Sequence, residues 1–154
     1  MSLSDFVGKC VAIFSGNTEK CLDIKNADNE GINKGMRCIF WDQHGRCNQQ
    51  WTVTEEGENL FKIRNFENQE VCLDVFNNET ANNTVVDTWA AEGPQKLNQL
   101  WSVVDGDAES GFVLEPAHAP GMALDYALHG DNKDSAIIWE KHGNDNQRFF
   151  FKEY

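Results

Sequence analysis

The chain has 154 residues and a formal net charge of −12, with 13 Lys and Arg residues against 25 Asp and Glu residues. Nucleic acid, heparin and anionic membranes attract proteins through clustered basic side chains, so this charge argues against all three as partners. The length is sufficient for a domain with its own hydrophobic core, and we expect a single domain over residues 1–154.

Short runs rich in Val, Ile, Phe and Trp alternate along the chain with clusters of Asn, Gly and Asp. These runs predict β-strands joined by turns, because β-branched and aromatic residues favour strands and no apolar pattern of helical spacing is sustained. In chain order the predicted strands are Cys10–Ser15, Cys21–Lys25, Met36–Trp41, Gln50–Thr54, Leu60–Arg64, Cys72–Phe76, Val85–Trp89, Leu100–Val104, Phe112–Glu115, Ala123–Ala127, Ala136–Glu140 and Arg148–Lys152.

The twelve predicted strands form three repeats, at approximately residues 6–54, 55–104 and 105–154. Each repeat contains an apolar segment that ends in Asp, and these aspartates recur at equal intervals of 51 residues: Asp23, Asp74 and Asp125. Three units of four strands are too few for a β-propeller, which needs at least about four blades. They suit a closed β-trefoil, in which closure removes exposed sheet edges. We therefore predict an all-β chain folded as a β-trefoil with pseudo-threefold symmetry.

A second motif follows the Asp in each repeat. In the first and third repeats a His lies three residues after a Trp, a Gly comes next, and an Asn-Gln pair closes the loop. The second repeat has the Trp and the Asn-Gln pair, but its loop is two residues longer and Glu92 occupies the His position. The motif residues are thus repeated in phase with the aspartates, which indicates a shared site and not only a shared fold.

The Leu-Asp segments and the Asn-Gln-x-aromatic closing signature together resemble the ricin-type (R-type, QxW) β-trefoil lectins. The spacing of Trp, His and Asn-Gln is also similar to that of the trefoil carbohydrate-binding modules of bacterial xylanases. The resemblance extends from about Val11 to Lys152. It implies a multivalent, non-catalytic lectin that binds terminal galactose or N-acetylgalactosamine at two or three pseudo-symmetric pockets, without a cofactor.

Binding a neutral sugar in water requires three kinds of residue. An aromatic plane covers the C–H face of the sugar, a carboxylate accepts hydrogen bonds from two neighbouring hydroxyls, and amide or imidazole groups fix the hydroxyl orientation. By resemblance, the Asp is the acceptor, the Trp is the stacking surface, the His and Asn contact hydroxyls, and the Gln orients the Asp and the loop. The residues carried over are Asp23, Trp41, His44, Asn48 and Gln49 in the first repeat, Asp74, Asp87, Trp89, Asn98 and Gln99 in the second, and Asp125, Trp139, His142, Asn146 and Gln147 in the third.

The repeats depart from the pattern at several positions. Asp87, two residues before Trp89, occupies a position where the family often has a polar sugar contact and where the other repeats have Ile39 and Ile137. The second pocket is therefore expected to be either a different subsite or inactive. Phe149 replaces the Trp of the closing signature, at a position that faces the core in this fold. The equivalent residues Trp51 and Trp101, and the leucines before the three aspartates, are likewise assigned to the core.

Each site assignment has a structural alternative. Trp41, Trp89 and Trp139 are also compatible with core positions, because buried Trp is common. The three aspartates could act as turn formers, and His44 and His142 could be solvated loop residues. The repetition of Asp, Trp and Asn at matching offsets favours the binding interpretation.

The chain has five cysteines, and the pairing usual in ricin-type repeats is absent, because Gln43 and Ala91 occupy the partner positions. A disulfide between Cys21 and Cys38 on neighbouring strands remains an open alternative. Cys38, His44 and Cys47 lie close in sequence, but structural zinc requires four ligands, so we expect no metal.

We expect no enzymatic activity, because the sequence shows no recognisable carboxylate pair, nucleophile elbow or phosphate-binding loop. The alternatives to a galactose lectin are a xylan-type polysaccharide-binding module and an inhibitor-like trefoil that binds proteins. The absence of a recognisable secretion signal and of a long apolar stretch predicts a cytoplasmic protein, with non-classical release as an alternative, and no membrane insertion. The aromatic run Phe149–Phe151 indicates either a homodimer contact or packing against the segment near Phe6.

Overall fold

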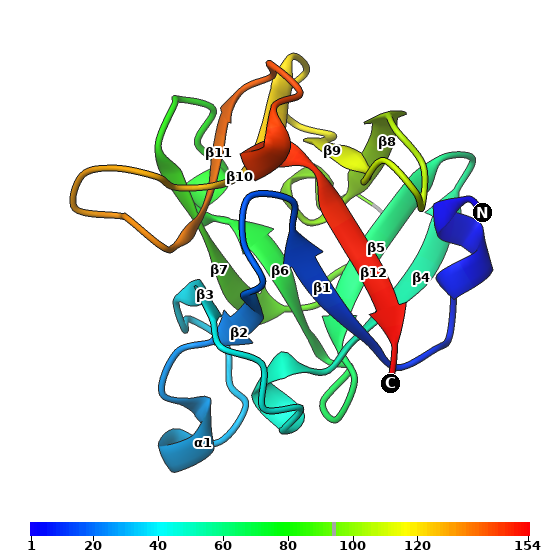
Figure 1. Cartoon of the computed structure of the whole chain (residues 1–154). Helices are drawn as coiled ribbons and strands as arrows, with labels where there is room; N and C mark the ends of the chain where they lie inside the picture. The colour runs from blue at the N-terminus through cyan, green and yellow to red at the C-terminus, as the bar shows by residue number, and fades with distance from the viewer. Residues whose placement is uncertain (94) are drawn as a thin grey trace.

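The computed structural model describes residues 1–93 and 95–154, apart from the side chains of residues 28 and 29. The described residues form twelve strands (Figure 1). Their bounds are β1 Val11–Ser15, β2 Cys21–Ile24, β3 Cys38–Trp41, β4 Trp51–Gly57, β5 Leu60–Asn65, β6 Val71–Val75, β7 Thr84–Ala90, β8 Trp101–Asp105, β9 Val113–Pro116, β10 Met122–Tyr126, β11 Ala136–Glu140 and β12 Phe149–Glu153.

Every predicted strand is present, with boundaries that differ by a few residues. The largest extension is at β4, which was expected to end at Thr54 and continues to Gly57. It continues because residues Glu58 and Asn59 make a tight hairpin in which Gly57 pairs with Leu60 and Asn59 adopts a left-handed φ of 50°. A tight turn of this kind allows the two strands to pair as far as the turn.

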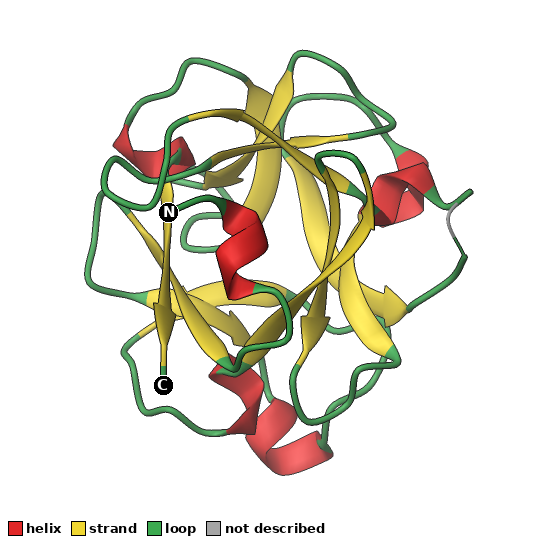
Figure 2. Ribbon diagram, turned by 90° about the vertical axis from the view of Figure 1, so that its right-hand side faces the viewer, coloured by secondary structure: helices red, strands yellow, loops and turns green. Residues whose placement is uncertain are grey.

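The helical segments are single turns, of which the first precedes β1 and the others lie in the connections between strands (Figure 2). The three that close the motif loops are equivalent in the three repeats, and each contains an Asn-Gln pair. The bounds are η1 Leu3–Phe6, α1 Ala27–Glu30, η2 Cys47–Gln49, η3 Phe76–Asn78, η4 Leu97–Gln99 and η5 Asp145–Gln147. None of the helices in the described residues is long and apolar enough to cross a membrane.

Six of the strands close into a barrel. β1 pairs with β4, β4 with β5, β5 with β8, and β8 with β9, all antiparallel. β12 pairs with β1 along five residues, and the bridge between Phe112 and Phe149 joins the β9 side of the barrel to β12. Figure 1 shows β1 and β12, near the two ends of the chain, side by side. The barrel therefore has no free edge along this circuit, as closure of a trefoil requires.

The other six strands form three hairpins, β2–β3, β6–β7 and β10–β11, one in each repeat. The hairpins contact one another in a ring. β11 pairs with β7 at Ile138 and Thr84, while shorter bridges join Arg37 to Asp87 and Ile39 to Ser135. A six-stranded barrel and three hairpins joined about an approximate threefold axis constitute the β-trefoil, which confirms the predicted fold class.

The core lies inside the barrel and beneath the hairpins. Trp51, Trp101 and Phe149, which follow the three Asn-Gln pairs, are all 0% exposed. The leucines that precede the three aspartates are also fully buried. Phe149 therefore replaces Trp in the packing, as predicted.

The aromatic run at the end of the chain packs against the N-terminal segment. The ring centroid of Phe6 lies 5.9 Å from that of Phe151 and 6.4 Å from that of Phe112. Phe150 is partly exposed between its two buried neighbours. Of the two alternatives for Phe149–Phe151, packing against the segment near Phe6 is thus present in the structure.

All five cysteines are free thiols, so the alternative of a Cys21–Cys38 disulfide is wrong. In the β2–β3 hairpin Cys21 lies opposite Trp41, whereas Cys38 lies opposite Ile24. The two cysteines are thus separated by three residues along the hairpin, roughly 10 Å at the usual strand rise, which is beyond disulfide reach.

Candidate functional site

The aspartates of the three repeats lie at equivalent buried positions on β2, β6 and β10. Asp23, Asp74 and Asp125 are 3%, 7% and 3% exposed. Each follows a leucine that faces the core, and because successive strand residues point to opposite faces, each Asp points away from that core. These positions exclude the alternative of an exposed turn-forming Asp.

The tryptophans stand on the partner strand of each hairpin, on the same face as the aspartate. Asp125 lies directly opposite Ile137, and Trp139 is two residues further along β11. The same register relates Asp23 to Ile39 and Asp74 to Asp87. Trp41, Trp89 and Trp139 are 55%, 40% and 39% exposed, so none is a core residue. Each repeat therefore presents a buried carboxylate beside an exposed indole.

Both oxygens of each carboxylate are held by the Asn-Gln pair on the following 3-10 helix. In the first repeat Asn48 Nδ2 donates to Asp23 Oδ1 at 2.9 Å, and Gln49 Nε2 donates to Asp23 Oδ2 at 2.7 Å. The corresponding distances are 3.1 and 2.9 Å for Asp74, and 3.0 and 2.9 Å for Asp125. The carboxylate is thus oriented before any ligand arrives.

Each glutamine also holds the loop that carries the His or its replacement. Gln147 Nε2 donates to the Glu140 carbonyl at 3.0 Å, and its Oε1 accepts from the backbone N–H groups of His142 and Gly143. Gln49 makes the same set of bonds in the first repeat. These contacts are those expected of a residue that orients both the Asp and the loop.

The asparagines can contact a sugar hydroxyl in fewer ways than expected. Asn98 Nδ2 donates to Asp74 and to the Val75 carbonyl, and Asn146 Nδ2 donates to Asp125 and to the Tyr126 carbonyl. Because an amide nitrogen has two N–H groups, these two asparagines can contact a sugar hydroxyl only as acceptors, through Oδ1. They help to orient the carboxylate, a role that the resemblance assigns to the glutamines alone.

The two histidines face their aspartates. His44 Nε2 lies 3.4 Å from Asp23 Oδ2, and His142 Nε2 lies 3.8 Å from Asp125 Oδ2. In both rings Nδ1 accepts a backbone N–H two residues later at 3.0 Å, so the neutral ring carries its proton on Nε2. Nε2 is thus placed to donate either to the carboxylate or to a ligand oxygen beside it.

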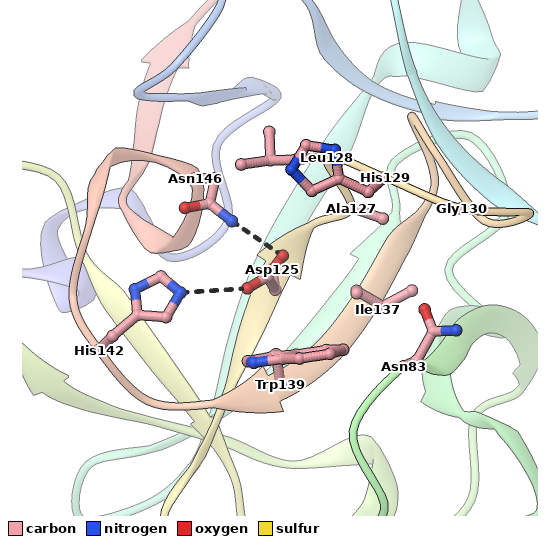
Figure 3. A pocket seen from close by; sticks show the side chains of 10 residues that line it. All are labelled: Asn83, Asp125, Ala127, Leu128, His129, Gly130, Ile137, Trp139, His142 and Asn146. Carbon is pink, nitrogen blue, oxygen red and sulfur yellow. Dashed lines mark hydrogen bonds and ion pairs between the residues drawn. The ribbon is translucent and has the colours of Figure 1, made fainter.

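In the third repeat these residues line a pocket with a cavity volume of about 340 Å³ (Figure 3). Asp125 lies at its centre, with Asn146 and His142 on one side and the flat face of Trp139 below. Ala127, Leu128 and Ile137 supply apolar wall, and Asn83 enters from the second repeat. Burial raises the pKa of Asp125 to about 6, although the Gln147 hydrogen bond and His142 act in the opposite direction.

The first pocket has the same set of residues. Asp23, Trp41, His44 and Asn48 line a cavity of about 400 Å³. Two basic residues that the sequence analysis did not single out, Lys25 and Arg46, join them.

The second pocket differs in chemistry. Asp87 lies opposite Asp74 and forms an ion pair with Arg37 from the first repeat, at 3.3 Å. Burial raises the pKa of both carboxyl groups. The Lys34 ammonium lies over the Trp89 ring, 4.9 Å from its centroid. A cation therefore already occupies one approach to this indole.

The longer loop of the second repeat is supported in a different way. In the first and third repeats, Gln50 and Arg148 donate to the carbonyls of the loop glycines Gly45 and Gly143, each at 2.8 Å. Leu100 occupies this position in the second repeat. There the amino group of Lys62, from β5, donates to the Glu92 carbonyl and lies 3.4 Å from Glu56. Residue 94 of this loop lies outside the described residues.

The structure adds pocket residues that the motif did not include. The residues two to four positions after each Asp line the pockets in part, among them Lys25, Phe76 and Leu128. Extending the alignment of the three repeats would have found them. Gly35 and Asn83 line the pockets of the following repeat, and no periodicity in the sequence indicates contacts between repeats.

Comparison with known proteins places this geometry in a family. The ricin-type beta-trefoil lectin domain matches residues 9–149 of the chain. Among solved structures, the designed 3-fold symmetric protein ThreeFoil has a TM-score of 0.79 at 26% identity, covering 94% of this chain and 99% of that chain. A comparison with curated proteins finds no match.

Two natural lectins of known structure are also similar. The Macrolepiota procera ricin B-like lectin, in complex with lactose, has a TM-score of 0.74 at 18% identity, covering 96% of this chain and 97% of that chain. The earthworm R-type lectin C-half, in complex with GalNAc, has a TM-score of 0.65 at 22% identity, covering 95% and 99%. At these identities the likeness is one of fold.

The family match extends over most of the chain, and the structure holds the signature residues together in each repeat. Domains of this family are generally non-catalytic carbohydrate-binding modules, and the match supports a carbohydrate-binding role here. The chain belongs to the ricin-type β-trefoil lectin family.

Proposed function

We propose that this protein is a non-catalytic lectin that binds terminal galactose or N-acetylgalactosamine at its pseudo-symmetric pockets. The observation that carries the proposal is the buried Asp, held through both oxygens by an Asn-Gln pair and placed beside an exposed Trp, in all three repeats. Because the acceptor is already held in one orientation, little conformational entropy is lost when a sugar binds.

The arrangement suits galactose for a stereochemical reason. Its axial 4-hydroxyl and neighbouring 3-hydroxyl lie on one side of the ring, where a single carboxylate can accept from both. The opposite side of the ring exposes C–H groups that can stack on an indole such as Trp139. His142, with the proton on Nε2, is placed to donate to a hydroxyl oxygen held near Asp125.

The first and third pockets are the principal sites in this proposal. Both have the His, and their tryptophans carry no cation over the ring among the described residues. The second pocket lacks the His, and Lys34 lies over Trp89, so we expect weaker binding there. Single-site affinity for a monosaccharide should be weak, and two or more pockets on one glycan surface would raise the apparent affinity and cross-link cells.

The test is a titration with galactose, N-acetylgalactosamine, lactose and xylobiose, followed by the NMR shifts of the Trp indole N–H groups. Galactosides should shift the indole signals of Trp41 and Trp139, whereas those of the buried Trp51 and Trp101 should move little. A response to xylobiose alone would replace the proposal with a polysaccharide-binding module. No response to any sugar would overturn it and favour a protein-binding trefoil.

A further inference from the structure

The three pockets share their Asp, Trp and Asn residues but differ in the charge of their rims. The first pocket is lined by Lys25 and Arg46, both exposed. At the positions equivalent to Lys25, two residues after the Asp, the other repeats have Phe76 and Ala127. At the positions equivalent to Arg46, two residues before the Asn, they have Lys96 and Asn144, so the first repeat alone has a basic residue at both of these positions.

These two cations stand out in a strongly acidic chain of net charge −12. In the part of the chain that the structure describes, neither Lys25 nor Arg46 forms an ion pair, whereas Arg37, Lys96 and Arg148 each pair with a carboxylate. The carboxylate that lines the first pocket, that of Asp23, is buried and engaged by Asn48 and Gln49. Among the described side chains, the rim of this pocket is therefore positive and exposed to solvent.

The two residues also approach the site from different elements. Lys25 follows β2 directly after the segment that carries Asp23, whereas Arg46 precedes η2 on the loop that carries His44. Both cations line the cavity in which a sugar would stack on Trp41 with two hydroxyls at Asp23. Arg pairs with planar or tetrahedral oxyanions through two N–H groups, and Lys adds a mobile point charge.

We propose that the first pocket takes an acidic saccharide, a galactoside with a carboxylate or sulfate group, whereas the third pocket takes the neutral form. This inference rests on the proposed function, because it assumes that a galactoside binds at Asp23 and Trp41. The negative group meets the Lys25 and Arg46 rim, and the hydroxyls meet the buried carboxylate. One pocket thus combines a negative acceptor in its depth with a positive rim.

The experiment uses the full chain and four probes: methyl galactoside, its 6-sulfate, methyl galacturonide and inorganic sulfate. A negative group at C6 leaves the 3- and 4-hydroxyls free, and the sulfate and carboxylate arms separate the two sources of charge. The Trp41 indole should saturate at a several-fold lower concentration of an anionic probe than of the neutral one, and the Trp139 indole should not. The preference should fade as salt is raised from about 0.02 to 0.5 M, because exposed charges are screened.

An exchange of residues between the first and third pockets tests the roles of Lys25 and Arg46. The double variant Lys25→Ala with Arg46→Asn gives the first pocket the residues of the third at these positions, and its ratio of anionic to neutral affinity should fall to that of the third pocket. Asn144→Arg should raise the ratio at Trp139; Ala127 is buried and is left unchanged. The control, Lys9→Ala with Lys152→Asn, removes the same charge away from the three Trp pockets and should leave the preference in place.

The outcomes separate the two proposals. A neutral galactoside that shifts neither Trp41 nor Trp139 overturns the proposed function. Binding of the neutral probe at both, with no anionic preference at Trp41 or with a preference that survives the exchange, overturns only this inference. An equal response of Trp41 to inorganic sulfate also overturns it, because the site would then select an anion and not an acidic sugar.

Discussion

At the scale of single residues, the three aspartates combine burial with a proposed role that requires charge. Asp125 is 3% exposed, and Asn146 and Gln147 donate to its two oxygens. These donors hold the carboxylate in one orientation. Removal of the Asp125 side chain should therefore reduce ligand binding at this pocket more than removal of an exposed carboxylate would.

Asp125→Ala should abolish sugar binding at the third pocket, with a loss of about 2 kcal/mol or more of binding free energy, because charge-assisted hydrogen bonds to two hydroxyls are lost. The measurement is a sugar titration of the Trp139 indole by NMR, with the Trp41 indole as an internal control. Unchanged saturation of Trp139 in a folded variant would show that the carboxylate is not the acceptor.

Sugar binding at the third pocket should depend on pH. Burial raises the pKa of Asp125 to about 6, and the ligand favours the ionised form, so affinity should decline as the pH falls through about 6. The contribution of this residue to the free energy of unfolding has the opposite sign. It is fully present below the unfolded pKa of about 4 and is lost as the pH rises through the folded value.

The check is a set of titrations between about pH 4.5 and 7.5, together with urea unfolding over the same range. The His142 ring faces the same carboxylate, so His142→Gln serves as the control. If the decline in affinity disappears in that variant, the histidine and not Asp125 carries the dependence.

At the scale of elements, the motif loops of the three repeats, two of which carry a His, are held by similar bonds from different sources. Gln50 and Arg148 donate from the residue after the Asn-Gln pair, whereas the second loop receives its bond from Lys62 on the neighbouring strand β5. Lys62 is 1% exposed, and a buried lysine persists where its amino group is paired. The second loop thus depends on a tertiary contact where the others depend on a local one.

Lys62→Met should destabilise the protein by roughly 1–3 kcal/mol, because the Glu92 carbonyl loses a charged donor, and should perturb the Trp89 indole more than that of Trp41 or Trp139. Leu100→Gln supplies the donor found at Gln50 and should recover part of the loss. The measurement is urea unfolding of both single variants and the double variant. If Leu100→Gln has the same effect in both backgrounds, the two residues do not share a role.

At the scale of the whole molecule, the two sets of tryptophans have separate tasks. Trp51 and Trp101 fill the core at 0% exposure, whereas Trp41, Trp89 and Trp139 lie at the surface in their pockets. There are two sets because each repeat contributes one aromatic residue to the barrel and one to its hairpin.

Trp101→Ala should destabilise the fold by roughly 3–5 kcal/mol through the cavity that it leaves. The matched variant Trp139→Ala removes the same side chain from a surface position and should reduce third-pocket binding at little cost in stability. Thermal or urea unfolding of both proteins makes the comparison. Similar losses of stability in the two variants would contradict the division between core and pocket.

The sequence by itself determined where the strands lie and that they form a β-trefoil. It also determined which Asp, Trp, Asn and Gln residues belong together in each repeat. It could do so because these features repeat at nearly constant offsets, and a repeated unit must use equivalent residues in equivalent ways. The burial of Trp51, Trp101 and Phe149, and the exposure of Trp41, Trp89 and Trp139, agree with the core and surface positions assigned from the sequence.

Only the tertiary structure decided how the repeats meet. The entry of Asn83 into the third pocket, the pairing of Arg37 with Asp87 and the placement of Lys34 over Trp89 join residues of different repeats. The offset of Cys21 from Cys38 is likewise a matter of strand register. Such contacts depend on packing around the threefold axis, where the repeats have diverged, and no local propensity or spacing encodes them.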